Sequence, residues 1–212
     1  MDRERPGAQE WVPRDGGIER LRDAAQECRG CELWRDATQA VFGDGPADVR
    51  MMLVGEQPGD REDLAGEPFV GPAGGILDRA LEAAGVERGE VYLTNAVKHF
   101  RFEERGKRRI HRKPDVAHIE ACHPWLEAEL DRVDPAVVVC LGATAARAVL
   151  GRAVKIGEER GTALDVGRRQ AVVTVHPSSI LRLRERGERD AAFEGLVADL
   201  RVAAETAQDL AR

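Results

Sequence analysis

The sequence is poor in aromatic residues and cysteines, and it has no long apolar runs. No run approaches the roughly 20 residues that span a bilayer. The amino-terminal stretch MDRERPGAQEWVPRDGG also has no apolar segment of the kind found in secretory signals. We therefore expect a cytoplasmic protein without membrane contact. Four cysteines in a reducing compartment argue against a disulfide framework and leave metal ligation open.

Internal repeats and low-complexity tracts are missing as well, which argues against a repeat array. The chain has 212 residues, enough for one sizeable α/β core but short for two ordinary domains. We predict a flexible amino-terminal arm over residues 1–17 and a single domain over residues 18–212, and we expect a monomer.

Four short apolar runs predict buried strands. Each is rich in β-branched residues and is bounded by Gly, Pro or Asp, which is typical of strands covered on both faces. The runs occupy residues 49–55, 91–97, 136–142 and 171–175.

Helical patterns alternate with these strands over residues 74–86, 115–133, 143–151 and 191–210. Residues 155–170 carry spaced glycines without a helical period and predict an irregular or hairpin connection. The alternation predicts a three-layer α/β/α sandwich with a central four-stranded parallel sheet.

Polar side chains follow three of the four predicted strands, where ligands bind in open parallel sheets. Turn formation accounts for the glycines and prolines at these places. It does not account for Glu56, Asn95 or His176. Asn95 offers one acceptor and a donor pair, which complement O4 and N3–H of uracil and mismatch cytosine.

A glycine-rich segment, GEQPGDREDLAGEPFVGPAGG, follows the first strand. Such a segment can present backbone N–H groups to an anion, but it matches neither phosphate-loop pattern, which argues against a P-loop nucleotide hydrolase. Phe69 lies within it as either a core residue or a flat platform on which a base stacks.

The stretch from Arg101 to Lys113 carries seven basic residues against Glu103 and Glu104, a local charge of +5, in a chain of net charge −6. A solvated loop is the simple interpretation. The alternative interpretation, which would give the segment a function, is that it binds nucleic acid.

Cys28 and Cys31 have the CxxC spacing that lets two thiolates face one metal or cluster, although redox pairs share it. Cys122 lies in a predicted helix, and Cys140 lies inside a predicted strand, where a buried thiol is expected.

Together the motifs GEQPG, FVGPAGG, TNAVKHF, KRRIH, LGATAA and HPSS, in this order, resemble the uracil-DNA glycosylase superfamily. The resemblance is closest to the iron-sulfur family 4 enzymes and, through GEQPG and KRRIH, to the UdgX group. It implies excision of uracil from DNA by cleavage of the N-glycosidic bond. It further implies that Phe69 stacks on a flipped uracil, that Asn95 reads its edge and that His176 lies near O2, where a helix-capping or core histidine is the alternative.

The same resemblance implies a covalent outcome at His111, the last residue of KRRIH. A neutral imidazole is a better nucleophile than water, and Glu56 can orient the ring and stabilise its proton. The protein would then stay bound to the abasic DNA. We expect Gln57, Asp60 and Ser178 to complete the substrate site.

Basic residues around His111 and after HPSS are expected to hold DNA phosphates. The segment after HPSS, with Ile180, Leu181, Arg182 and Arg184, also lies where relatives place a loop that wedges into the base stack. The expected phosphate contacts are Lys107, Arg108, Arg109, Arg112, Lys113, Arg182 and Arg184.

Family 4 members carry four cysteine ligands, and the resemblance places the third at His99 in this chain. Cys28, Cys31, His99 and Cys122 are therefore the expected ligands of a 4Fe-4S cluster, with Cys140 or His123 as substitutes for the fourth. A structural zinc ion is the competing interpretation.

Two other functions stay open at this point. One is a family 4 glycosylase that turns over, in which His111 only contacts DNA. The other is a nonenzymatic metal-containing protein that binds nucleic acid through its basic segment.

Overall fold

A five-stranded sheet forms the centre of the computed structural model, which describes residues 5–210. Four strands are parallel, and the fifth, β6, pairs antiparallel with β7 at one edge. The predicted parallel core is therefore confirmed, and β6 comes from the segment predicted as a hairpin. The order is β2 (Val91–Asn95), β1 (Met51–Gly55), β5 (Val137–Leu141), β7 (Arg169–Thr174) and β6 (Ala163–Val166).

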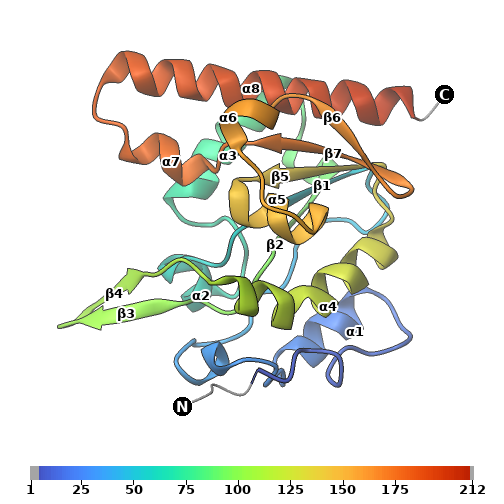
Figure 1. The fold of residues 1–212 in the computed structure, drawn as a ribbon, viewed down its shortest axis with the longest axis vertical. Coiled ribbons are helices and arrows are strands. Elements are labelled where there is room, and N and C mark those ends of the chain that lie inside the picture. Colours follow the sequence, from blue (N-terminus) through green and yellow to red (C-terminus); the bar gives the residue numbers. More distant parts are fainter. Residues whose placement is uncertain (1–4, 211–212) are drawn as a thin grey trace.

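Helices cover both faces of this sheet (Figure 1). One face carries α3 (Pro72–Ala84), α7 (Pro177–Arg182) and α8 (Arg186–Asp209). The other carries α1 (Ile18–Ala25), α4 (Val116–Val133) and α5 (Ala143–Leu150). Successive strand residues alternate between the two cores, as strand geometry requires, so the predicted three-layer sandwich is confirmed. Short helices lie between the main elements: η1 (Glu32–Arg35), α2 (Asp60–Ala65), η2 (Arg88–Glu90) and α6 (Ile156–Glu159).

The ends of the long helices follow from their sequences. Helix α3 begins with Pro72 in its first turn and ends at Gly85, whose φ of 78° only glycine adopts at no cost. Helix α4 begins at Asp115, whose carboxylate accepts a hydrogen bond from the His118 N–H at 3.1 Å.

The basic segment forms a hairpin where a loop was expected. Strands β3 (Phe102–Arg105) and β4 (Arg108–His111) pair antiparallel, and a two-residue turn joins them with Gly106 at φ 63°. The hairpin extends away from the main sheet (Figure 1). Most of its residues are charged, so the sequence shows no alternation of apolar and polar residues that would predict strands.

The amino-terminal segment is packed against the domain as far as the structure describes it. The Gly7 N–H donates to the Gly30 carbonyl at 3.0 Å, the Ala8 N–H donates to the Ala121 carbonyl at 2.8 Å, and Ala8 is buried. Gly7 and Ala8, within the predicted flexible arm, therefore make specific contacts with the domain, and residues 1–4 lie outside the described residues.

No helix within the described part of the chain is both long enough and apolar enough to cross a membrane.

Candidate active site

Side chains from the carboxyl ends of the strands and from the β3–β4 hairpin surround one cavity of about 390 Å³. Because β1, β2, β5 and β7 are parallel, the segments that follow them meet at one edge of the sheet. The residues that line the cavity include Gln57, Asp60, Phe69, Asn95, His111, His176 and Ser178. All seven were candidates from the sequence.

Phe69 forms one wall of this cavity in an unusual backbone conformation. Its φ is 58°, in the left-handed region that residues with a side chain rarely adopt. The ring lies nearly parallel to the imidazole of His176, with 6.4 Å between centroids. Such local strain is often found at ligand sites. A flat aromatic face with a fixed position suits stacking on a planar ligand.

Gly55, the last residue of β1, lies against this wall. A Cβ atom there would overlap Oδ1 of Asn95 and would come within 2.7 Å of Cζ of Phe69. The absence of a side chain at Gly55 thus lets Asn95 and Phe69 approach one another.

Asn95 ends β2 with its side chain almost fully buried, at 3% exposure. Its carbonyl accepts a hydrogen bond from Nζ of Lys98 at 2.8 Å, and Lys98 pairs with buried Glu129. Among residues 5–210 no side chain or backbone group forms a hydrogen bond with the Asn95 amide, which lines the cavity and is not among the fully enclosed polar atoms. A buried amide normally has one, so this side chain is available to a ligand in the cavity.

His176 caps helix α7 and also faces the cavity. Its Nδ1 accepts a hydrogen bond from the Ser178 N–H at 3.2 Å and lies 2.9 Å from Oγ of Ser178. Burial, with the nearby His111 and Arg182, lowers the pKa of His176 to about 4. The ring is therefore neutral at pH 7, and because Nδ1 accepts, its proton lies on Nε2.

His111 ends the hairpin strand β4 beside Glu56. Its Nε2 lies 3.6 Å from Oε1 of Glu56, and Oε2 of Glu56 accepts a hydrogen bond from the Thr144 hydroxyl at 2.5 Å. Burial lowers the pKa of His111, as does Arg182, while Glu56 raises it. The imidazole is therefore neutral at pH 7 and next to a carboxylate.

Gln57 holds the base of the hairpin. Its Oε1 accepts a hydrogen bond from the Arg101 N–H at 3.1 Å, and its amide group donates to the carbonyls of Arg101 and Arg112 at 3.2 and 3.1 Å. The same amide nitrogen lies 2.9 Å from Nε2 of His111. Gln57 thus fixes the position of His111 through the backbone on both sides of the hairpin.

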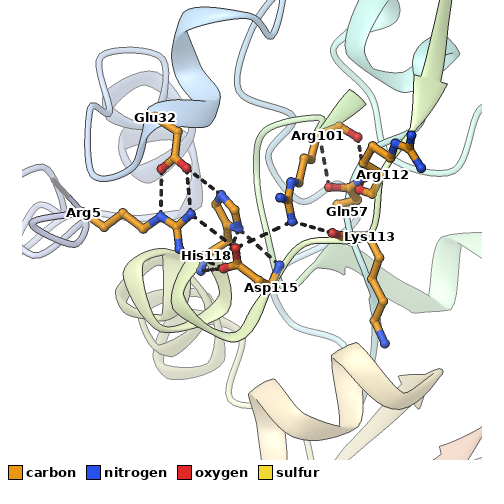
Figure 2. A network of polar contacts seen from close by, with 8 residues as sticks. All are labelled: Arg5, Glu32, Gln57, Arg101, Arg112, Lys113, Asp115 and His118. Carbon is orange, nitrogen blue, oxygen red and sulfur yellow. Dashed lines mark hydrogen bonds and ion pairs between the residues drawn. The ribbon is translucent and has the colours of Figure 1, made fainter. Parts of the chain in front are cut away.

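A network of polar contacts continues from these Gln57 hydrogen bonds to the amino-terminal segment (Figure 2). Arg101 donates to the Lys113 carbonyl at 2.7 Å and lies 3.7 Å from Asp115. Asp115 in turn pairs with Arg5 at 2.9 Å, and Arg5 also pairs with Glu32. The hairpin base is therefore connected to the region around Cys31.

Two of the expected phosphate contacts form ion pairs within the protein. Arg109 pairs with Asp60 at 2.6 Å and with buried Asp63 at 2.5 Å, so it attaches the hairpin to α2. Arg112 pairs with Glu103. The other expected phosphate contacts, Lys107, Arg108, Lys113, Arg182 and Arg184, are exposed, and Arg182 also donates to Oγ of Ser178 at 3.4 Å.

Only one of the two expected wedge residues reaches the surface. Ile180 is buried at 3% exposure, whereas Leu181 is 47% exposed and lines the mouth of the cavity. Leu181 is therefore the residue of this pair that can contact a molecule bound at the cavity.

Three of the expected cluster ligands come together in the core beside α1 and α4. Cys28, Cys31 and Cys122 are buried there, close enough for their charges to influence one another. The Trp125 indole N–H lies 3.3 Å from Sγ of Cys28, and the Lys98 N–H lies 3.3 Å from Sγ of Cys122. Burial raises the pKa of Cys31 to about 11 and also raises that of Cys122.

The candidates for a fourth ligand lie in different surroundings. His99 is buried, with its pKa lowered to about 4, and its charged neighbours are Asp63 and Arg29. Cys140 lies inside β5, where burial alone raises its pKa to about 12. His123 lies 3.5 Å from Glu127 on a more exposed part of α4. Within residues 5–210, no three such side chains converge on a position for a single metal ion.

Several residues of this site carry no signal in the sequence that identifies their roles. Thr144 is one example, because its partner Glu56 is 88 residues away. Gln57, which holds the hairpin through Arg101, is another, because the two residues are 44 positions apart. The one available signal was the position of Thr144 just after a predicted strand.

Comparison with known proteins finds a matching family and several similar enzymes. The profile of the uracil DNA glycosylase superfamily matches residues 42–201. A type-4 uracil-DNA glycosylase of Thermotoga maritima is 35% identical over 84% of this chain and 91% of its own length. Those of Pyrobaculum aerophilum and Archaeoglobus fulgidus are 35% and 34% identical, over 83% and 82% of this chain and 92% and 90% of their own lengths.

Proposed function

We propose that this chain, which belongs to the uracil-DNA glycosylase superfamily, is an enzyme that excises uracil from DNA. The observation that carries the proposal is the cavity at the strand ends, which is lined by an aromatic ring on a strained backbone, by the amide of Asn95 and by a neutral imidazole. Phe69 stacks on the base, and the Asn95 amide pairs with O4 and N3–H of uracil.

His176 stabilises the leaving base. When the bond between C1′ and N1 breaks, its electron pair stays with uracil, and negative charge develops on the base. Nε2–H of His176 donates a hydrogen bond to O2, as in oxyanion-type stabilisation. Because Ser178 holds Nδ1, the donor points in a fixed direction.

We further propose that His111 takes the place of water at C1′. A lone pair of the neutral ring forms the new C–N bond while the C1′–N1 bond breaks, and uracil leaves with the electron pair of that bond. The resulting positive charge lies on the imidazole beside Glu56. Loss of the remaining ring proton to solvent leaves a neutral N-alkyl imidazole, which has no easy leaving step. The protein then acts once and marks the abasic site.

A glycosylase that turns over is the second candidate, and the similarity to type-4 enzymes supports it. In that reaction Glu56 holds a water molecule that attacks C1′, and His111 contacts DNA. Incubation with single-stranded uracil-containing DNA followed by a denaturing gel separates the two: a heat-stable shifted band supports attachment, whereas free abasic DNA with repeated turnover supports hydrolysis.

Exposed basic side chains around the cavity supply phosphate contacts in either case. Lys107 and Arg108 lie at the hairpin tip, and Arg182 and Arg184 lie on the α7 side. Contacts of this kind are independent of sequence and weaken with salt.

Acidification is expected to slow formation of the adduct. Only the neutral imidazole of His111 has a free lone pair, so the rate should be constant near pH 7 and fall below the lowered pKa of His111. In Glu56→Gln the negative charge that raises this pKa is absent, so the acid limb should move to lower pH. Single-turnover rates between about pH 4 and 8 would measure it, and a shift to higher pH would contradict the assignment.

We propose a 4Fe-4S cluster at Cys28, Cys31 and Cys122, with His99 as the fourth ligand. The three buried thiols and the N–H groups directed at their sulfurs suit thiolate ligation, and a structural zinc ion is the competing occupant of the same thiols. The cluster would have a structural role, tying η1 and α4 to the segment that leads into the hairpin.

Replacement of Cys122 by serine is expected to remove the iron, because it removes a thiolate that is fully enclosed. The measurements are iron content and broad visible absorbance of the purified protein. Cys140→Ser, equally buried but away from the other cysteines, is the matched control and should keep both. Colourless wild-type protein with stoichiometric zinc would refute the cluster.

A further inference from the structure

Thr144 is a buried residue next to the proposed reaction centre, and neither its sequence motif nor the proposed mechanism gives it a role. We propose that Thr144 is a positioning residue that fixes the carboxylate of Glu56 in the orientation needed at His111. The inference rests on the proposed function and concerns how its central pair of residues is held.

The sheet brings the two residues together. Strands β1 and β5 are neighbours, so the segments that follow them lie side by side. Glu56 directly follows β1, and Thr144 lies in the first turn of α5. The threonine hydroxyl donates to Oε2 of Glu56 at 2.5 Å, and the threonine itself is only 3% exposed.

This hydrogen bond makes the two oxygens of Glu56 unequal. Oε2 is occupied by the hydroxyl, and Oε1 faces Nε2 of His111 at 3.6 Å. The terminal torsion of a glutamate is broad and allows the carboxylate to rotate. A charge-assisted hydrogen bond from a buried hydroxyl restricts that rotation. Among the described residues, no other side chain donates a hydrogen bond to this carboxylate.

Thr144 acts through Glu56 and does not touch the substrate. It is absent from the lining of the cavity that holds Phe69 and Asn95. It lines instead a second cavity of about 390 Å³, between Lys113 and Arg147. A change at Thr144 should therefore alter the reaction at C1′ without altering the surface that meets uracil.

The test uses two variants of the full chain, Thr144→Val and Thr144→Ser. Valine has nearly the shape of threonine but no hydroxyl, so we expect single-turnover adduct formation to slow roughly 10-fold, as for loss of one hydrogen bond to a charged group. Serine keeps the donor and should restore a rate close to the wild-type value. Affinity for an oligonucleotide with 2′-fluoro-deoxyuridine, which resists cleavage, should be the same for all three proteins.

A double-mutant cycle with Glu56→Gln tests the route of the effect. If Thr144 acts through the carboxylate, Thr144→Val should have little further effect in the Glu56→Gln protein. A wild-type rate in Thr144→Val, failure of serine to rescue, or full additivity with Glu56→Gln would each overturn the proposal. If the wild-type chain releases uracil without an adduct, covalent attachment fails separately, and Thr144 is judged by the rate of uracil release. A wild-type chain that releases no uracil would overturn both proposals.

Discussion

Replacing His111 by alanine is expected to abolish the heat- and detergent-stable complex with uracil-containing DNA completely. The variant removes the ring whose Nε2 lies 3.6 Å from Oε1 of Glu56, and among the described residues that line the cavity the other imidazole is that of His176. His176 cannot substitute, because Ser178 occupies its Nδ1 and the Nε2 atom carries the proton. The measurement is a denaturing gel with single-stranded DNA.

The same substitution should spare the pocket for the base. Phe69, Asn95 and His176 belong to other elements, so uracil release should continue when water enters the space beside Glu56. His111→Ser leaves similar room and should gain repeated turnover. His123→Ala, which removes a partly exposed histidine on α4, is the matched control and should keep the shifted band. A stable band in His111→Ala would refute attachment through this residue, and loss of uracil release in His111→Ser would count against the mechanism.

A single methyl group at Gly55 is expected to reduce uracil excision by about 100-fold or more, the order of loss caused by small misplacements in active sites. In Gly55→Ala the new Cβ would overlap Oδ1 of Asn95 and crowd the ring of Phe69. One of them must move, so either the hydrogen bonds to the base or the stacking platform is lost. Single-turnover rates at saturating enzyme would measure the effect.

Gly75→Ala provides the comparison. Gly75 lies in α3, where a Cβ would meet nothing within 4 Å, so alanine there should keep the full rate and favour the helix. Thermal unfolding of both variants separates pocket damage from loss of the fold. Wild-type excision in Gly55→Ala would mean that Asn95 and Phe69 do not hold the base as proposed.

The parts of the fold that sequence could predict are those with strong apolar patterns. The apolar runs that form β1, β2, β5 and β7 can be recognised from their own residues, without knowledge of what they pack against. Because these strands are parallel, the residues at their carboxyl ends meet at one edge of the sheet. Asn95 and His176 were identified on that basis. The β3–β4 hairpin could not be, because its charged side chains hide the strand period and its position depends on Gln57 and Arg109.

Roles that depend on partners distant in the chain could not be predicted from the sequence for the same reason. Arg109 was expected to meet DNA phosphates because it is basic and lies in a basic run. Its contacts with Asp60 and Asp63, 49 and 46 residues away, exist only in the folded chain. Ile180 and Leu181 have similar side chains, and only the packing of α7 decides which one is exposed.

Gln57 attaches the β3–β4 hairpin, which carries His111, to the rest of the domain. The proposed nucleophile is carried by an element that belongs to a separate two-stranded sheet, whereas the base pocket is built from the main one. Phe69, Asn95 and His176 lie outside the hairpin, so replacing the hairpin would change the nucleophile but would keep these three residues of the base pocket. We therefore expect that grafting this hairpin, with the glutamine that anchors it, onto a glycosylase that turns over would introduce the proposed attachment without rebuilding the base pocket.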